Sequence, residues 1–163
     1  MLLPVELAPG DVPAFFDLDA DGDVDLLVGK ATGNLACYQN LSLSGKPDFR
    51  LENGQCGGLD TASELPNLAV AVADLDGDGK LDLFAGNRPG EIRIFRSFTD
   101  HMVEFPAPET PLFNMDSVRM PASAKPGNLL HPAAADLNGD GFPEIILGTQ
   151  AGGLIYLRNA SKP

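Results

Sequence analysis

Three stretches of the chain place oxygen-bearing side chains at the same spacing. Each has Asp or Asn at positions 1, 3 and 5, Gly at position 6 and Asp or Glu at position 9, and they span residues 17–25, 74–82 and 136–144. Ca²⁺ takes six to eight oxygen ligands from carboxylates, amides and backbone carbonyls. Alternate positions of a tight loop can direct oxygens to one point, and Gly at position 6 tolerates the positive φ of a sharp turn. The spacing therefore predicts up to three bound Ca²⁺ ions, one per stretch.

The candidate ligands are the side chains at positions 1, 3, 5 and 9 and the backbone carbonyl at position 7. They are Asp17, Asp19, Asp21, Asp23 and Asp25 in the first stretch, Asp74, Asp76, Asp78, Lys80 and Asp82 in the second, and Asp136, Asn138, Asp140, Phe142 and Glu144 in the third. The third stretch has one carboxylate fewer, a longer ninth side chain and Pro143 at position 8. We therefore expect the third site to be the weakest.

The stretches begin as an EF-hand loop does but end differently. An EF-hand needs a bidentate Glu at position 12 and flanking helices, whereas position 12 is Val28, Ala85 or Leu147 here. The following residues are short apolar runs closed by Gly, which are typical of buried strands. The alternative is that the stretches are acidic surface turns, since Asp, Asn and Gly favour turns for local reasons. Three copies with the same spacing and flanks argue against that alternative.

Composition and charge narrow the class of protein. The chain has 163 residues, 44% of them hydrophobic, which suffices for one domain with a core. Its 18 Gly and 14 Pro favour short strands and turns over long helices. The net charge of −12 argues against nucleic-acid binding. The stretches hold five, four and three acidic residues, which are twelve of the 23 in the chain. The excess negative charge is therefore concentrated where cations would bind.

Short apolar runs recur around each acidic stretch with periods of 57 and 62 residues. The predicted strands are residues 13–16, 70–73 and 132–135 before the stretch, 25–28, 82–85 and 144–147 after it, and 35–39, 92–96 and 154–158 beyond a Gly-containing turn. Apolar residues alternate in the last group, as in half-buried strands. Ala lies three residues before every stretch (Ala14, Ala71 and Ala133), which predicts a crowded position.

A fourth strand in each unit is predicted from weaker signals. The candidates are residues 47–51 in the first unit and either 102–105 or 111–115 in the second. The third unit ends directly after its third strand, and residues 2–7 are expected to supply an out-of-phase fourth strand. The prediction is a single all-β domain over 1–163 with units at about 11–66, 67–128 and 129–163, and with residues 1–10 as the out-of-phase strand. Repeated four-stranded antiparallel units suggest β-propeller blades.

The remaining sequence features leave alternatives open. Cys37 and Cys56 are either two thiols or a disulfide, which the sequence alone does not decide. The triplets beginning at Asn40 and Asn159 match the N-glycosylation pattern only weakly. The first four residues are too short and lack the basic start of a signal peptide, and the sequence has no apolar run long enough to span a membrane.

The repeated motif resembles FG-GAP/VCBS repeats, as in the integrin alpha-subunit propeller and many bacterial secreted propellers. The matching residues are Asp-Leu-Asp-x-Asp-Gly-x-x-Asp followed by Leu-Leu-Val-Gly at 17–29, with close copies at 74–86 and 136–148. The resemblance implies a β-propeller with Ca²⁺ in the hairpin loop between the first two strands of each blade, bound by the ligands named above. Propellers have 4–8 blades. Three blades therefore imply a partial propeller in a longer chain or half of an oligomeric ring, in which two chains give six blades.

The resemblance implies a non-enzymatic, calcium-binding module for adhesion or ligand recognition outside the cell or at its surface. The expected ligand is a protein or carbohydrate, with neither nucleic-acid binding nor membrane insertion, and the signal peptide is expected outside this chain. The alternative is a carbohydrate-binding propeller or a non-catalytic part of a secreted polysaccharide-active enzyme. Sugar-binding sites usually contain aromatic side chains, and the chain has no Trp and only two Tyr, which argues against this alternative. A carboxylate-based hydrolase is disfavoured because the Asp clusters suit metal loops, and His101 and His131 are isolated in the sequence.

Overall fold

The chain folds into short antiparallel strands. The computed structural model describes residues 5–42, 45–59, 65–109, 114–115, 118–119 and 126–159. The strands in this part of the chain are β1 (Val12–Phe16), β2 (Asp25–Gly29), β3 (Leu35–Asn40), β4 (Phe49–Asn53), β5 (Ala69–Ala73), β6 (Asp82–Gly86), β7 (Ile92–Phe95), β8 (Asn114–Met115), β9 (Val118–Arg119), β10 (His131–Ala135), β11 (Glu144–Gly148) and β12 (Leu154–Leu157). Two 3₁₀ turns accompany them, η1 (Cys56–Gly58) and η3 (Phe98–His101).

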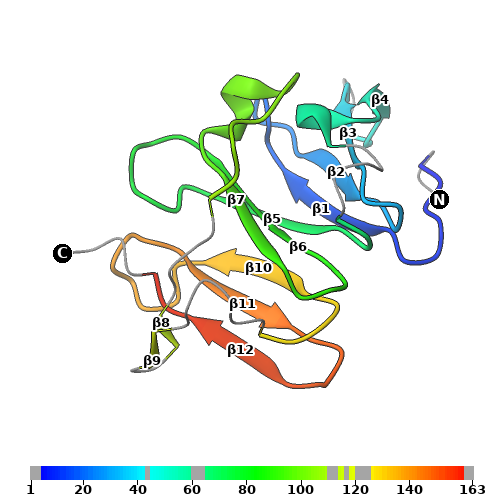
Figure 1. Cartoon of the computed structure of the whole chain (residues 1–163). Helices are drawn as coiled ribbons and strands as arrows, with labels where there is room; N and C mark the ends of the chain where they lie inside the picture. Colours follow the sequence, from blue (N-terminus) through cyan, green and yellow to red (C-terminus); the bar gives the residue numbers. More distant parts are fainter. Residues whose placement is uncertain are drawn as a thin grey trace.

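The strands form three sheets that follow one another in chain order (Figure 1). The first sheet has the order β1-β2-β3-β4, the second β5-β6-β7 and the third β10-β11-β12, and all of their pairings are antiparallel. β8 and β9 form a separate two-stranded ribbon. In the described part of the chain, no helix combines the length and the apolar character that crossing a bilayer requires.

The structure confirms the first three predicted strands of each unit. Their ends agree with the prediction to within one residue. The predicted fourth strand at residues 47–51 is observed slightly later, as β4. The second unit differs from the prediction. Residues 102–105 form no strand there, and Glu109 instead makes an isolated antiparallel bridge with Ile94 of β7. The other candidate, residues 111–115, is described only at 114–115, where β8 pairs with β9 rather than with the second sheet.

The predicted out-of-phase strand at residues 1–10 has no strand structure in its described part. Residues 5–7 have no strand structure, and residues 1–4 lie outside the described residues. Val5 packs against a buried cluster on the first sheet that includes Leu26, Val28 and Phe49. The N-terminal segment thus covers the outward side of the first sheet within this chain.

Consecutive units are joined by the same pair of backbone hydrogen bonds. The N–H groups of Asn67 and Leu68 donate to the carbonyls of Ala31 and Lys30 at 2.9 and 3.2 Å. One unit later, the N–H groups of Leu129 and Leu130 donate to the carbonyls of Arg88 and Asn87 at 2.9 and 3.1 Å. Asn67 and Leu129 both have left-handed backbone conformations, with φ of 54° and 53°. The repetition of this unusual geometry shows that the two junctions are built in the same way.

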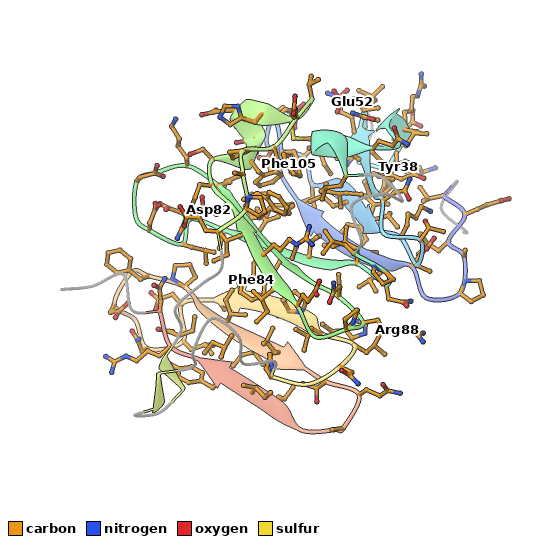
Figure 2. All side chains as sticks on the ribbon, in the orientation of Figure 1. Tyr38, Glu52, Asp82, Phe84, Arg88 and Phe105 are labelled. Atoms are coloured by element: carbon orange, nitrogen blue, oxygen red, sulfur yellow. A yellow bond between two sulfur atoms is a disulfide. The ribbon has the colours of Figure 1, made fainter. Side chains whose placement is uncertain are left out.

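The hydrophobic core lies between the sheets. One buried cluster joins Leu27, Leu35 and Cys37 of the first sheet to residues such as Leu83 and Phe95 of the second. A second cluster joins the second sheet to the third, and Figure 2 shows its largest member, Phe84, between those two sheets. Face-to-face burial of this kind is how sheets with one apolar face become stable. Each unit therefore depends on its neighbour for burial.

The two cysteines form a disulfide between β3 and η1. Cys37 and Cys56 are both fully buried, with Cα atoms 6.2 Å apart. This separation is within the range that a disulfide can bridge. The bond closes a span of 19 residues around β4 and fixes η1 against the first sheet.

The close approach of the first two units depends on Gly29 at the end of β2. A Cβ atom at this position would clash with the backbone carbonyl oxygen of Leu68, a residue whose N–H donates to the Lys30 carbonyl at the junction. We expect Gly29→Ala to lower the free energy of unfolding by about 2–3 kcal/mol or more. Gly148 is the matched control, because a Cβ atom there would meet its nearest atom at 3.7 Å. Urea denaturation checks the prediction, and equal losses for Gly29→Ala and Gly148→Ala would contradict it.

Candidate metal centre

The three acidic stretches form loops with one shared hydrogen-bond pattern. In each loop, a carboxylate oxygen at position 1 accepts the N–H of the Gly at position 6, at 3.1, 2.9 and 2.9 Å. Those glycines have φ of 93°, 84° and 88°. Such values are rarely adopted by residues with a side chain. The tight turn predicted from Gly at position 6 is thus confirmed in all three loops.

Two further hydrogen bonds repeat along each loop. The oxygen at position 3 accepts the N–H of position 5, at 3.3, 3.2 and 2.8 Å. The oxygen at position 5 accepts the N–H of position 7, at 2.8, 2.8 and 3.0 Å. Each of these side chains uses one oxygen for the turn and has a second polar atom. The position 7 residues contribute only their backbone N–H groups to these hydrogen bonds. Their carbonyl oxygens are not used in them, and they remain predicted metal ligands.

The first two loops gather their carboxylates closely enough for one ion. One oxygen each from Asp17, Asp19 and Asp21 lies within 4.8 Å of the others, and a second group is formed by Asp74, Asp76 and Asp78. Oxygens on opposite sides of a Ca²⁺ ion, each 2.3–2.6 Å away, are about 5 Å apart. The two triads therefore have the dimensions of a cation site, and carboxylate oxygens are the ligands that hard cations prefer.

The first loop also has an oxygen with no partner. Oδ1 of Asp17 is buried and has no hydrogen-bond donor in the described part of the chain. An unpaired carboxylate oxygen removed from water is unfavourable unless a cation or a donor compensates it. This atom fits a metal ion bound among Asp17, Asp19 and Asp21.

The carboxylate at position 9 is buried in every loop, with exposed fractions of 2% for Asp25, 1% for Asp82 and 1% for Glu144. Asp25 accepts the N–H of Leu18 at 2.9 Å and that of Asn40 at 2.8 Å. These bonds tie the loop to the end of β3. Asp25 and Asp82 lie outside the two triads. The structure therefore gives position 9 a role in holding strands together, and its role as a metal ligand remains a prediction.

A cationic side chain from the end of the third strand contacts the carboxylates of the second loop. The guanidinium of Arg96, at the end of the third strand of its unit, lies 2.7 Å from Oδ2 of Asp82, 3.4 Å from Asp76 and 3.2 Å from Glu109. In the first loop the equivalent residue is Gln39, whose amide donates to Asp19 at 2.7 Å. The second triad is thus partly neutralised by the protein, whereas the first is not.

The third loop has the same turn but a weaker set of ligands. Its first five positions contain only two acidic residues, Asp136 and Asp140. The amide nitrogen of Asn138 donates to Glu144 at 2.6 Å, so this pair satisfies part of its own hydrogen-bonding capacity. The ring of Phe142 lies close to Gly77, which places the second and third loops side by side.

The local environment shifts the pKa of two loop carboxyls in opposite directions. Burial and the neighbouring Asp82 carboxylate raise the pKa of Asp76, although the Asp78 N–H and Arg96 oppose the shift. Hydrogen bonds from the backbone N–H groups of Gly141, Gly139 and Asp140 lower the pKa of Asp136. Ionisation is therefore less favourable at Asp76 than at Asp136.

The sequence-based prediction missed the contacts from the end of the third strand. A signal for them does exist, because Gln39, Arg96 and Arg158 each follow position 3 of their loop by 20 residues. The weak glycosylation triplets have another explanation. Asn40 is buried, with its side chain bonded to the backbone of Val24 and Asp48. The Asn159 amide donates to the carbonyls of Leu75 and Pro143, linking the second and third loops.

The sequence of this chain matches a known family model. The FG-GAP-like repeat model matches residues 17–85 and 74–147, from the start of the first loop to the penultimate residue of β11. The chain belongs to the FG-GAP-like repeat family. Both matches include the second loop, so the model describes a pair of neighbouring FG-GAP-like units rather than one loop.

A solved structure has a similar arrangement. A chain of the Photorhabdus luminescens Tc holotoxin pore matches with a TM-score of 0.54 and 26% identity. The match covers 96% of this FG-GAP-like chain and 7% of that chain. This chain therefore spans only a small part of the length of the toxin chain that it matches. No curated protein matches it.

The opposite pKa shifts of Asp76 and Asp136 give a test in the metal-free protein. A raised pKa in the folded state makes ionised Asp76 destabilising, and this loss develops as pH rises from the ordinary value of 3.8 through the raised value. Asp76→Asn should therefore increase stability at pH 7, with the gain vanishing below pH 3.8. A lowered pKa makes ionised Asp136 stabilising above 3.8, and this stabilisation is lost as pH falls through the lowered value.

Asp136→Asn is accordingly expected to reduce stability at pH 7. Denaturant unfolding in chelator at several pH values measures both effects. Changes of the same sign for the two variants at pH 7 would contradict the electrostatic description of the loops.

Proposed function

We propose that the chain is a non-enzymatic, calcium-binding module of the β-propeller type that serves adhesion or ligand recognition outside the cell or at its surface. The observation that carries this proposal is the pair of carboxylate triads, one of which contains the unpartnered buried oxygen of Asp17. A Ca²⁺ ion bound there would supply positive charge and take several oxygens of the loop as ligands. The residues of the loop supply the oxygens and a turn that is already formed by backbone hydrogen bonds.

The position of the triads supports a structural role for the metal. Both lie in the loop that joins the first two strands of a unit, next to the buried position 9 carboxylate that holds the end of the third strand. Carboxylates gathered this closely repel one another when no cation is present. A cation in the loop therefore stabilises the same strands that the position 9 carboxylate ties together.

The disulfide supports the proposed location. Disulfides form and persist in oxidising compartments and are rare in the cytosol, and Cys37 and Cys56 are paired here. Extracellular Ca²⁺ suits modules with dissociation constants of about 10⁻⁴ to 10⁻³ M. The proposed partner is a protein or a carbohydrate, with further blades supplied by a longer chain or by a second copy. The similar segment of the Tc holotoxin pore chain, embedded in a much longer protein, is consistent with a modular role.

Calcium titration of the purified chain tests the metal sites. At calcium about ten times the dissociation constant, each filled loop should add about 1.4 kcal/mol to the free energy of unfolding. The double variant Asp17→Asn with Asp21→Asn should lose one equivalent of bound calcium in isothermal titration calorimetry. The control is Asp48→Asn, which removes a carboxylate from an exposed ion pair outside the loops. Equal binding by all three proteins would exclude the first loop as a site, and no binding by the unmodified chain would overturn the proposal.

Arg96 provides a second, independent test, because its guanidinium shares the carboxylates of the second loop with any bound cation. Arg96→Gln introduces the residue type that Gln39 represents in the first unit. We expect tighter calcium binding in the second loop, by about tenfold for a change of about 1.4 kcal/mol. The metal-free variant should be less stable, because Asp82 loses a partner while it stays buried. The converse change, Gln39→Arg, should weaken the first site. Unchanged affinities in both variants would contradict this assignment.

A further inference from the structure

The guanidinium of Arg96 is held by carboxylates from three parts of the second unit. Its Nη1 atom lies 2.7 Å from Oδ2 of Asp82 and 3.4 Å from Oδ2 of Asp76, and its Nε atom lies 3.2 Å from Oε2 of Glu109. Asp76 belongs to the loop, Asp82 begins β6 and Glu109 bridges β7. A guanidinium has several N–H donors in one plane, so it can bond to carboxylates on more than one side at once. The second unit therefore contains a guanidinium site that its own chain fills.

The first unit repeats all three of these carboxylates. Counting from position 1 of each loop makes Asp19 equivalent to Asp76, Asp25 to Asp82, and Glu52 to Glu109. The two Glu residues also lie beside the same point of the third strand. Glu52 is the residue of β4 where the register shifts next to Cys37, and Glu109 bridges Ile94, the equivalent of Cys37. The arginine itself is the member of the set that differs, because its equivalent is Gln39.

A cavity of about 300 Å³ lies among these residues of the first unit. The polar residues that line it include Asp19, Asp25, Gln39 and Glu52, the last of which is labelled in Figure 2. Leu18 of the loop and Met102 of the second unit add apolar surface. No residue that lines the cavity in the described part of the chain carries a positive charge. The first unit thus has an anionic cavity where the second unit has a guanidinium.

The carboxylates of this cavity have hydrogen-bonding capacity to spare. Oδ2 of Asp82 accepts both a loop N–H and the Arg96 guanidinium, at 3.1 and 2.7 Å. Oδ2 of Asp25 accepts the equivalent N–H, that of Leu18, and has no second donor among the described residues. Glu52 is exposed and has neither an ion pair nor a hydrogen bond within the part of the chain that is described. Since a carboxylate oxygen can accept two hydrogen bonds, a guanidinium placed here would find its acceptors available.

The cavity is distinct from the metal triad of the first loop, although the two share Asp19. Asp25 and Glu52 lie outside that triad. The second unit has the same arrangement, since Asp76 belongs to its triad and also lies 3.4 Å from Arg96. A guanidinium in the cavity and a cation in the triad would therefore occupy neighbouring sites.

We infer that the cavity of the first unit binds a guanidinium group from outside the chain, the side chain of an arginine on a partner protein, in the position that Arg96 takes in the second unit. The equivalent carboxylates of the same molecule already bind this planar group. Leu18 and Met102 offer apolar surface to the stem of a long side chain. The inference deepens the proposed ligand recognition by naming the chemistry of the partner, and it rests on that proposal only for the choice of a protein as the source.

N-acetylarginine amide is the probe, because it carries the guanidinium together with the backbone amides of an arginine in a protein. Its binding to the whole chain is followed by the NMR shifts of backbone amides, in chelator so that no metal competes for Asp19. We expect saturable shifts in the first loop and at the end of β3, with a dissociation constant of about 1 mM. N-acetylcitrulline amide has nearly the same shape without the charge, and it should bind at least about tenfold more weakly. Equal binding of the two probes, or no saturation below about 50 mM, would overturn the inference.

Two substitutions change the cavity in different ways. Glu52→Gln removes an exposed carboxylate outside the metal triad, so it should weaken probe binding about fivefold and leave calcium binding unchanged. Gln39→Arg gives the first unit a guanidinium of its own and should abolish probe binding. The matched control is Glu6→Gln, the same change at an exposed residue that does not line the cavity, which should bind as the unmodified chain does. Unchanged binding in both cavity variants, or an equal loss in the control, would overturn the site.

Propylguanidine separates the two possible sources of the guanidinium, because it has the side chain of arginine without the backbone. Binding no tighter than that of N-acetylarginine amide supports an arginine of a protein. Binding at least about tenfold tighter than that of the amide would overturn a protein as the source.

Calorimetry with calcium on the same proteins distinguishes this inference from the metal proposal. A chain that binds calcium but not the arginine probe overturns the guanidinium site alone. A chain that binds the probe in chelator but takes up no calcium overturns the metal proposal alone.

Discussion

In the first two units, the loop and the end of the third strand both depend on the buried carboxylate at position 9. In the first unit, one oxygen of Asp25 binds the N–H of Leu18 at the start of the loop and the other binds the N–H of Asn40 at the end of β3. Asp82 does the same with Leu75 and Ser97. A buried carboxylate is tolerated only with such donors. One side chain therefore fixes the hairpin loop and the third strand together, and this holds the remaining carboxylates of the loop in one place.

That fixed geometry carries three different electrostatic environments. The first loop gathers its carboxylates around an oxygen of Asp17 that has no donor, and it offers only the neutral amide of Gln39. The second loop has the same triad but includes the guanidinium of Arg96. The third has fewer carboxylates and pairs Asn138 with Glu144. The turn is therefore the same in all three units. The residue at the end of the third strand differs between units, and this changes how much of the loop's negative charge the protein itself neutralises.

The sequence predicted what depends on local geometry. Gly at position 6 and oxygens at alternate positions determine the turns, and alternating apolar residues determine the strands, so both could be located before the structure. The role of position 9 could not be predicted, because one of its two donors lies at the end of another strand, 15 residues away. The pairing of Cys37 with Cys56 depends on a distance between separate elements. The sequence left two candidates for the fourth strand of the second unit, because residues 97–132 have no clear periodicity. Residues 102–105 form no strand, and the observed contact in the described residues is a bridge at Glu109.

The most direct test of the central claim is a crystal structure of the protein grown in millimolar calcium. We expect a strong density peak at about 2.3–2.6 Å from carboxylate oxygens of Asp17, Asp19 and Asp21, with Oδ1 of Asp17 among them. A second peak is expected in the triad of Asp74, Asp76 and Asp78. Water at both positions, with the loops and their hydrogen bonds unchanged, would contradict the claim and leave the triads as turns stabilised by the protein alone.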